Sequence, residues 1–327
     1  MRTGFLNLSG LSFLLAFCVV ILGAYVRLSN AGLGCPDWPG CYGDLFVTEE
    51  TRVTAAQRAS GARAFDMDKA VKEMIHRYAA GILGILVLLM ATLSWRMRRD
   101  DRILCSILLG LVALQALLGM WTVTELLKPI IVAAHLLGGM LVLGMLYWVI
   151  LRQLPRVAGN RGHAQTARLA LVALAVLAAQ MFSGGWTSAN YAALACPEFP
   201  TCRDGLYWPE TDFREAFTVW HGGRIDYEGG ILDAPARTAI HLTHRLGAAL
   251  TFLVVLTVAL CALFRAGRPA RLMAAFMLFV LSLQVTLGVA NVLLRLPLPV
   301  AVAHNSVAAL LMLSLLSLYR HARAGGD

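Results

Sequence analysis

Charged side chains are scarce in this sequence. Asp, Glu, Lys and Arg together make up 14% of its 327 residues, whereas hydrophobic residues make up 58%. In an average soluble domain about a quarter of the residues are charged. The scarcity therefore excludes an ordinary soluble protein and indicates a membrane protein that crosses the bilayer several times.

We also expect no cleavable signal peptide. The first apolar stretch, residues 6–26, is too long for the apolar core of a signal peptide, and no clear cleavage site with small residues follows it. We therefore expect this stretch to form the first membrane span.

Long apolar runs are what the sequence has in abundance. A helix that crosses a bilayer needs about 20 mostly apolar residues. Eight runs meet this requirement: 8–28, 74–94, 103–124, 130–151, 168–188, 238–263, 271–293 and 299–319. The predicted fold is an all-α membrane protein with eight transmembrane helices.

The formal net charge of +9 can reflect nucleic-acid binding or membrane topology. We favour topology and expect no nucleic-acid partner, because the basic residues gather in short connections that the positive-inside rule places in the cytoplasm. These residues are Arg96, Arg98, Arg99, Arg102, Arg152, Arg156, Arg161, Arg168, Arg265, Arg268, Arg271, Arg320 and Arg323. The pattern predicts a bacterial inner-membrane protein with both termini in the cytoplasm and two long loops, 29–73 and 189–237, on the outer side.

The two halves of the sequence repeat one another. In each half a glutamine precedes a histidine by twenty residues; the two pairs are Gln115 with His135 and Gln284 with His304. Internal repeats of this kind are typical of duplicated membrane proteins. We therefore predict two duplicated four-helix bundles, an N-terminal half of residues 1–160 and a C-terminal half of residues 161–327.

Each half also contains a cysteine pair in its long loop. Both loops follow the pattern Cys-Pro-acid-aromatic-Pro-x-Cys, from Cys35 to Cys41 and from Cys196 to Cys202. An outer location would expose these pairs to an oxidising compartment. Each pair can be a structural disulfide or a labile redox pair, and the pattern leaves both interpretations open.

Four histidines occupy matching places near the outer ends of the even-numbered spans: His76, His135, His244 and His304. A single histidine of this kind is more often a hydrogen-bonded core residue, but four at equivalent positions favour ligands. Two facing imidazoles in a four-helix bundle suit a haem iron. Zinc fits less well, because it usually takes four ligands and each half offers two matched histidines. We therefore predict that His76 pairs with His135 and that His244 pairs with His304.

Charged residues flank the first histidine of each pair. Arg77 and Arg245 can bind haem propionates, or can extend to the membrane interface. Glu73 lies one helical turn before His76, and its counterpart in the second half is His241. A carboxylate there can accept a proton or stabilise a developing cation, or it can simply favour the start of the helix. We expect the N-terminal half to react and the C-terminal half to hold its haem.

These features together resemble the heme A synthase family over almost the whole chain. The resemblance lies in the stretch Gly23–Leu28, the first cysteine loop, the Glu73-x-x-His76-Arg77 motif and the three later histidines. It implies a membrane enzyme that converts heme O to heme A, the cofactor of terminal oxidases. The implied reaction oxidises the C8 methyl to a formyl group by successive hydroxylation and loss of water.

The resemblance also implies roles for individual residues. Glu73, His76 and His135 correspond to the reactive site for the substrate haem, and His244 and His304 to the ligands of a bound haem b. The pairs Cys35–Cys41 and Cys196–Cys202 correspond to disulfides. The family pattern does not assign a role to the polar stretches 48–72 and 204–235.

Partners and alternatives follow from the same features. Besides heme O, the expected partners are membrane lipid, the enzyme that supplies heme O, an electron acceptor and further copies of this chain. The alternatives are a membrane protein that transfers electrons through two b haems, or a haem carrier. All four histidines are near the outer side, which argues against electron transfer across the membrane. A carrier would not need a carboxylate beside one ligand.

Overall fold

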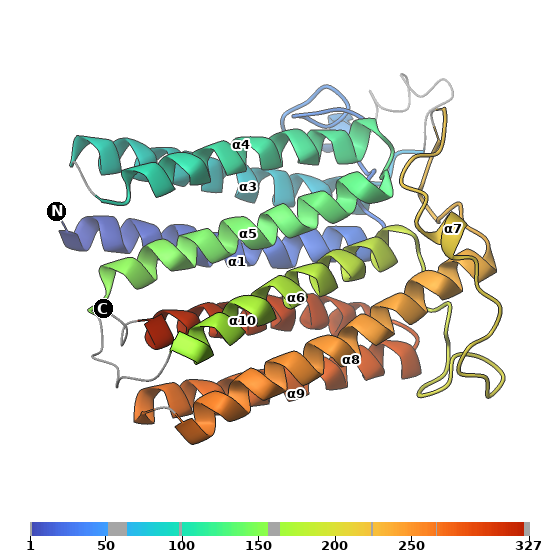
Figure 1. Cartoon of the computed structure of the whole chain (residues 1–327). Helices are drawn as coiled ribbons and strands as arrows, with labels where there is room; N and C mark the ends of the chain where they lie inside the picture. The colour runs from blue at the N-terminus through green and yellow to red at the C-terminus, as the bar shows by residue number, and fades with distance from the viewer. Residues whose placement is uncertain are drawn as a thin grey trace. The chain divides into compact units, whose positions relative to one another are not determined.

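The computed structural model describes residues 2–51, 64–97, 100–155, 164–223, 225–265 and 267–323 (Figure 1). Within these ranges the chain is helical, with two isolated β-bridges and no strand. The predicted all-α fold is confirmed. Arg98, Arg99, Arg156 and Arg161, which entered the topology prediction, lie outside the described residues.

Eight helices are long and apolar enough to cross a membrane, as predicted. They are α1 (Arg2–Leu28), α3 (Met67–Arg96), α4 (Arg102–Thr124), α5 (Pro129–Gln153), α6 (Ala164–Ala189), α8 (Ala234–Arg265), α9 (Arg268–Leu293) and α10 (Leu298–Arg323). Each one coincides with a predicted apolar run, so the chain is a multi-pass membrane protein.

Most of these helices extend beyond the apolar runs. The largest differences are at the starts of α3 and α1: α3 begins at Met67 rather than near residue 74, and α1 begins at Arg2 rather than near residue 8. Asp66 caps α3 by accepting a hydrogen bond from the backbone N–H of Lys69 at 3.2 Å. A count of apolar residues misses this polar first turn, because capping depends on one side chain and not on hydropathy.

The tight turns before α5 and α10 have the same backbone form. Leu126 and Leu127 have φ of 51° and 62°, and Arg295 and Leu296 have φ of 58° and 62°. Two successive left-handed residues without glycine are sterically costly. These left-handed residues reverse the chain direction within a few residues. The next helices then begin at Pro129 and Leu298.

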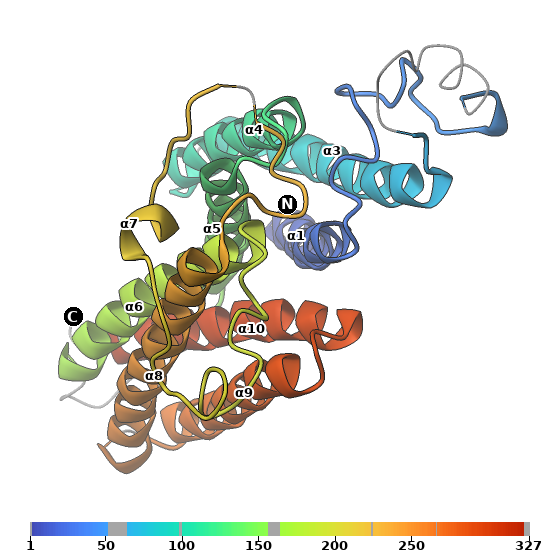
Figure 2. The ribbon, with the colours of Figure 1, turned by 90° about the vertical axis from the view of Figure 1, so that its right-hand side faces the viewer.

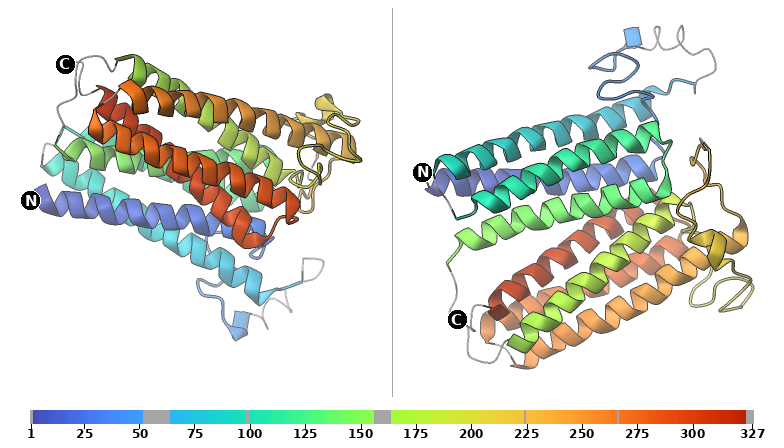
Figure 3. Two further views of the ribbon diagram at one scale, coloured as in Figure 1. Left: turned by 90° about the horizontal axis from the view of Figure 1, so that it is seen from below. Right: turned by 45° about the horizontal axis from the view of Figure 1, so that its top comes forward.

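The first compact unit comprises Met1–Leu143 and Thr218–Ile231. Within it α1 packs on α3, and α3 packs on α4. Figure 3 shows α1, α3 and α4, coloured from blue to green, side by side, with the first loop at the end far from the N-terminus.

Residues 218–231, which we call the crossing segment, belong to this unit although they come late in the chain. The backbone N–H of Tyr227 donates to the carbonyl of Leu126 at 3.1 Å, in the α4–α5 turn. The Lys128 ammonium lies 3.0 Å from the centre of the Trp220 ring. Figure 2 shows this segment passing the loop end of α4.

The second unit comprises Gly144–Phe217 and Leu232–Asp327. Within it α6 packs on α8 and α10, and α9 packs on α8 and α10. The short helix α7 (Phe213–Ala216) packs on α8 and is capped by Asp212, whose carboxylate accepts from the N–H of Glu215. The expected boundary after residue 160 lies outside the described residues, and α5 is divided between the units after Leu143.

Candidate functional site

The first cysteine loop is attached to α3 through Glu73. Cys35 and Cys41 form a disulfide, and the N–H of Cys35 donates to Glu73 Oε2 at 2.9 Å. The other carboxylate oxygen, Oε1, forms an ion pair with Arg77 one turn along the helix. Glu73 is 4% exposed and lies about two turns inside α3. The alternative that it favours the helix start is therefore wrong, because Asp66 does that.

Arg77 also binds the first cysteine loop, through the backbone carbonyls of the loop. Its guanidinium donates to the carbonyls of Asp37 at 2.8 Å and Gly40 at 2.5 Å. Gly40 is required by a close approach of the backbone, since a Cβ there would lie 2.5 Å from the carbonyl oxygen of Asp44. Arg77 therefore links the Glu73 carboxylate to the backbone of the disulfide loop.

The second cysteine loop is attached to α8 in the same manner, with a different side chain. Cys196 and Cys202 form a disulfide, and the N–H of Cys196 donates to Nδ1 of His241 at 3.1 Å. The Arg245 guanidinium donates to the carbonyls of Thr201 at 2.9 Å and Glu198 at 2.7 Å. Glu73 and His241 therefore both accept the N–H of the first cysteine, but a negative charge is available only from Glu73.

Both arginines thus donate to loop carbonyls, Arg77 through Nη1 and Arg245 through Nη1 and Nη2. Nε of Arg245 is buried without a hydrogen-bond partner. Binding of haem propionates by Arg77 and Arg245 stays a prediction, and the loop contacts are an additional role that the sequence analysis missed.

Loss of Arg77 is expected to open the first loop. Arg77→Met removes charged donors to two carbonyls, each worth about 1.5–3 kcal/mol. We expect dithiothreitol to reduce Cys35–Cys41 about tenfold faster or more, because a loosened loop exposes the disulfide more often. Mass-tagged maleimide after prior blocking of the free thiols Cys18, Cys105 and Cys261 measures this rate.

The second loop provides the control for that experiment. Cys196–Cys202 should be reduced at the wild-type rate in Arg77→Met, and Arg245→Met should give the opposite pattern. An unchanged rate at Cys35–Cys41 would show that Arg77 does not hold its loop.

Glu198 is a residue of the second cysteine loop, and its carboxylate accepts hydrogen bonds from other residues of that loop. Hydrogen bonds from the Thr201 hydroxyl and the backbone N–H groups of Gly205 and Asp204 lower the pKa of its carboxyl below the usual value. A lowered pKa stabilises the folded loop above the carboxyl's ordinary pKa of about 4.3, and this contribution is lost as pH falls through the lowered value.

We therefore expect the amides of Asp204 and Gly205 to keep their protection from hydrogen exchange at pH 5 and to lose part of it below the folded-state pKa. Exchange followed by mass spectrometry, corrected for the intrinsic pH dependence, measures the change. Glu198→Gln has no titrating group and should show weaker protection that does not vary over this range. The same pH dependence in both proteins would contradict the assignment.

The four predicted histidines fall into two pairs, one in each unit. His76 on α3 and His135 on α5 are near enough to interact electrostatically, as are His244 on α8 and His304 on α10. The structure therefore brings together the residues that the sequence pattern paired.

Each histidine ring lies against a glycine of a neighbouring helix. The pairs are Gly23 with His76, Gly119 with His135, Gly184 with His244 and Gly288 with His304. A Cβ built on these glycines would lie 3.0–3.4 Å from Cε1 of the ring. The glycines thus allow each ring to pack closely against the backbone of the neighbouring helix.

The nitrogen atoms of these rings are mostly unused. Nδ1 of His76, His135 and His304 is buried without a hydrogen-bond partner of good geometry. Among the described residues no cluster of three or more His, Cys, Asp or Glu could hold a bare metal ion. Two half-buried imidazoles per unit, most of whose ring nitrogens make no hydrogen bond within the described residues, are a donor set that fits a haem iron.

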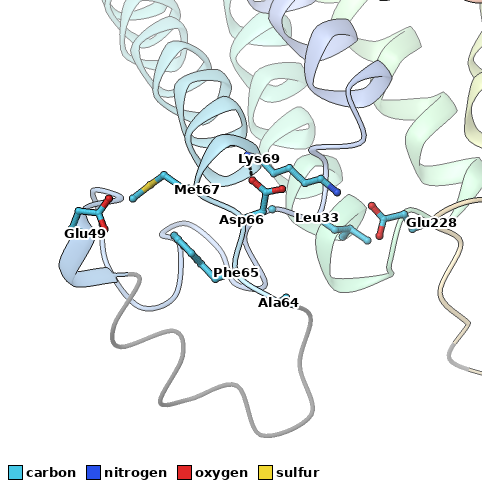
Figure 4. Close-up of a pocket in the computed structure, with 9 residues that line it drawn as sticks. Leu33, Glu49, Ala64, Phe65, Asp66, Met67, Lys69 and Glu228 are labelled. Atoms are coloured by element: carbon cyan, nitrogen blue, oxygen red, sulfur yellow. Dashed lines mark hydrogen bonds between the residues drawn. The ribbon is translucent and has the colours of Figure 1, made fainter.

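A separate pocket of about 630 Å³ opens beside the start of α3 (Figure 4). It is lined by Leu33, Gly34, Glu49, Ala64, Phe65, Asp66, Met67, Lys69 and Glu228. None of the four histidines lines it. It marks where the crossing segment, through Glu228, approaches the first loop.

Other histidines do not join these pairs. His163 lies outside the described residues. His221 is in the crossing segment against the ring of Tyr227, and His321 is near the end of α10.

Comparison with known proteins gives one consistent result. Residues 7–316 match the family COX15-CtaA, described as cytochrome oxidase assembly protein. A heme A synthase of Shewanella oneidensis is 44% identical over 92% of this chain and 91% of its own. A heme A synthase of Granulibacter bethesdensis is 28% identical over 94% of this chain and 84% of its own.

Proposed function

Because this chain belongs to the COX15-CtaA family of heme A synthases, we propose that it oxidises the C8 methyl of heme O to a formyl group. The product would be heme A, the cofactor of terminal oxidases. The similarity makes it a heme A synthase by homology, and the particular reaction is our proposal.

The difference between Glu73 and His241 is the observation that carries this proposal. Both side chains make the same contact with the N–H of a cysteine, at 2.9 and 3.1 Å. If the two units only held haem, no negative charge would be needed in one alone. The buried carboxylate one turn from His76 therefore supports a reactive site in the first unit and a holding site in the second.

In the proposed reaction, His76 and His135 hold the iron of heme O and orient its ring. Oxidation passes electrons from the ring methyl to the external electron acceptor, develops positive charge at the methyl carbon and releases protons. Water then adds to that carbon and supplies the oxygen atom of the formyl group. The Glu73 carboxylate stabilises that charge and accepts a proton, since a buried acceptor acts strongly where water is excluded. The ion pair with Arg77 offsets part of the cost of holding a Glu73 carboxylate in a buried position.

His244 and His304 would hold haem b, which supplies a one-electron redox centre when bound. Arg77 and Arg245, near the loop end of their helices, would bind propionates with the donors that the loops leave free. We propose that both termini are cytoplasmic, so that the cysteine loops face the outer side. An electron acceptor and the enzyme that supplies heme O complete the expected partners.

Haem extraction from a host that makes heme O but no heme A tests the proposal. Membranes with this protein should give a new heme A peak on chromatography, and the peak should be absent with His76→Ala. His321→Ala is the matched control. It also replaces a histidine by alanine, but at the far end of α10, about 25 Å along the helix from His304. Purified protein that carries haem b but leaves heme O unchanged would favour electron transfer or haem carriage instead.

A further inference from the structure

The ring of His244 is held by two polar side chains of α6. Nδ1 lies 3.1 Å from Nε2 of Gln180 and 3.2 Å from Oγ of Ser183. The Gln180 amide also donates to the carbonyl oxygen of His244 at 3.0 Å. When Nδ1 carries the proton, the Ser183 hydroxyl accepts it, which leaves the lone pair of Nε2 available for a metal. The Gln180 amide nitrogen can only donate, so in this tautomer it holds the residue through the His244 carbonyl oxygen.

The matching positions in the first unit are apolar. Gly23 and Gly184 each precede the first cysteine of their loop by twelve residues, and each lies against the first histidine ring of its unit. Gln180 and Ser183 are four and one residues before Gly184. Val19 and Leu22 are four and one residues before Gly23.

His76 consequently lacks the support that His244 has. The side chains of Val19 and Leu22 have no hydrogen-bonding group, and Nδ1 of His76 is buried without a partner of good geometry. The backbone of Val19 is its polar neighbour. Among the four predicted ligands, only His244 has side-chain hydrogen bonds at Nδ1 in the described residues.

We propose that Gln180 and Ser183 are positioning residues that make His244 a permanent haem ligand, and that Val19 and Leu22 leave His76 free to release its haem. A ligating histidine is fixed in tautomer and orientation by the partner of its other nitrogen, and loss of such a partner lowers metal affinity about 10- to 100-fold. The inference rests on the proposed function, in which the first unit must exchange heme O for heme A while the second keeps haem b.

The different support of His76 and His244 suits the different tasks of the two units, which are release of the product haem and retention of haem b. The product must leave the first unit after each reaction, so a weakly supported ligand favours release. Haem b must stay through many reactions, so a supported ligand favours retention. Nδ1 of the second histidines, His135 and His304, lacks a partner in both units, so this nitrogen does not distinguish them. Nε2 of His304 lies 3.3 Å from Nε2 of Gln284.

Transfer of haem to apomyoglobin tests the second unit. The purified full-length protein in detergent is mixed with excess apomyoglobin, and absorbance follows the loss of haem b. Gln180→Val with Ser183→Leu copies the first unit and should speed this loss about 10- to 100-fold. Thr187→Val is the matched control, because its hydroxyl bonds the carbonyl of Ser183 and not the ring, and it should lose haem b at the wild-type rate.

Smaller changes decide the result if the double variant does not fold. Ser183→Ala should also speed the loss of haem b, and Ser183→Thr, which keeps the hydroxyl, should restore the wild-type rate. Wild-type rates in the folded double variant, or in Ser183→Ala, would overturn the inference.

The reciprocal change tests the first unit. Val19→Gln with Leu22→Ser gives His76 the partners of His244, and heme A should then be retained on the purified protein and pass to apomyoglobin more slowly than from wild type. Unchanged retention of heme A would overturn the inference while the proposed function stands. A wild-type protein that holds no haem b and forms no heme A would instead contradict the proposed function itself.

Discussion

Replacing Glu73 by histidine is expected to abolish heme A formation while the first cysteine loop and haem b stay in place. This change copies the second unit, where His241 Nδ1 accepts the N–H of Cys196. The loop keeps its acceptor, but the carboxylate that stabilises positive charge is gone. We expect turnover to fall about 10²- to 10⁴-fold, as for loss of a general base.

Three further variants distinguish the negative charge of Glu73 from its hydrogen bond to the first cysteine loop. Glu73→Gln keeps an oxygen for the Cys35 N–H without the negative charge and should be nearly as inactive. Glu73→Ala should also lose activity, and in addition leaves that N–H and the Arg77 charge without a partner. His241→Glu should not create a second reactive site. Normal heme A formation by Glu73→His or Glu73→Gln would refute the catalytic role.

Loss of a histidine from either pair should remove one haem and leave the other. His244→Ala and His304→Ala are expected to lose haem b from the purified protein, because a haem with one axial imidazole is bound less tightly and exchanges. His76→Ala and His135→Ala should keep haem b but yield no heme A. Haem content by pyridine haemochrome and chromatography, normalised to protein, distinguishes these outcomes.

The assignment of units depends on this contrast. If His244→Ala retained haem b in full while His76→Ala lost it, the reactive and holding sites would be exchanged. His221→Ala in the crossing segment is the control, and it should retain both haem b and heme A formation. A general loss of haem in all variants, with the protein still folded, would argue against separate sites.

Hydropathy predicted most of the fold because a membrane span is a local property. Each of the eight helices contains a predicted apolar run, and the differences are confined to the helix ends, such as residues 67–73 at the start of α3. The pairing of the histidines could also be predicted, because the repeat places His135 and His304 twenty residues after a glutamine and places an arginine directly after His76 and His244. Duplication of the two halves itself remains a prediction, supported by the matching loop contacts.

The loop contacts could not be predicted in the same way. Glu73 meets Cys35 across 38 residues and His241 meets Cys196 across 45, so the contact depends on how the loop folds back on its helix. The sequence did contain a signal, because Glu73 and His241 are equivalent and each loop begins with a cysteine. This signal could be interpreted only with the hydrogen bonds of the structure. They show that Glu73 and His241 both accept the N–H of a loop cysteine and differ in charge.

The crossing segment has a consequence for how the protein is made. Tyr227 and Trp220 complete contacts at the α4–α5 turn, yet they are synthesised after α6 and α7. Domains usually form as the chain emerges, the N-terminal one first. Here the first unit cannot be finished until residue 231 has left the ribosome, so its last contacts form only after the second unit has begun to insert. A stop anywhere between α5 and α8 would leave both units incomplete, and neither unit could be inherited or exchanged as a single uninterrupted stretch of gene.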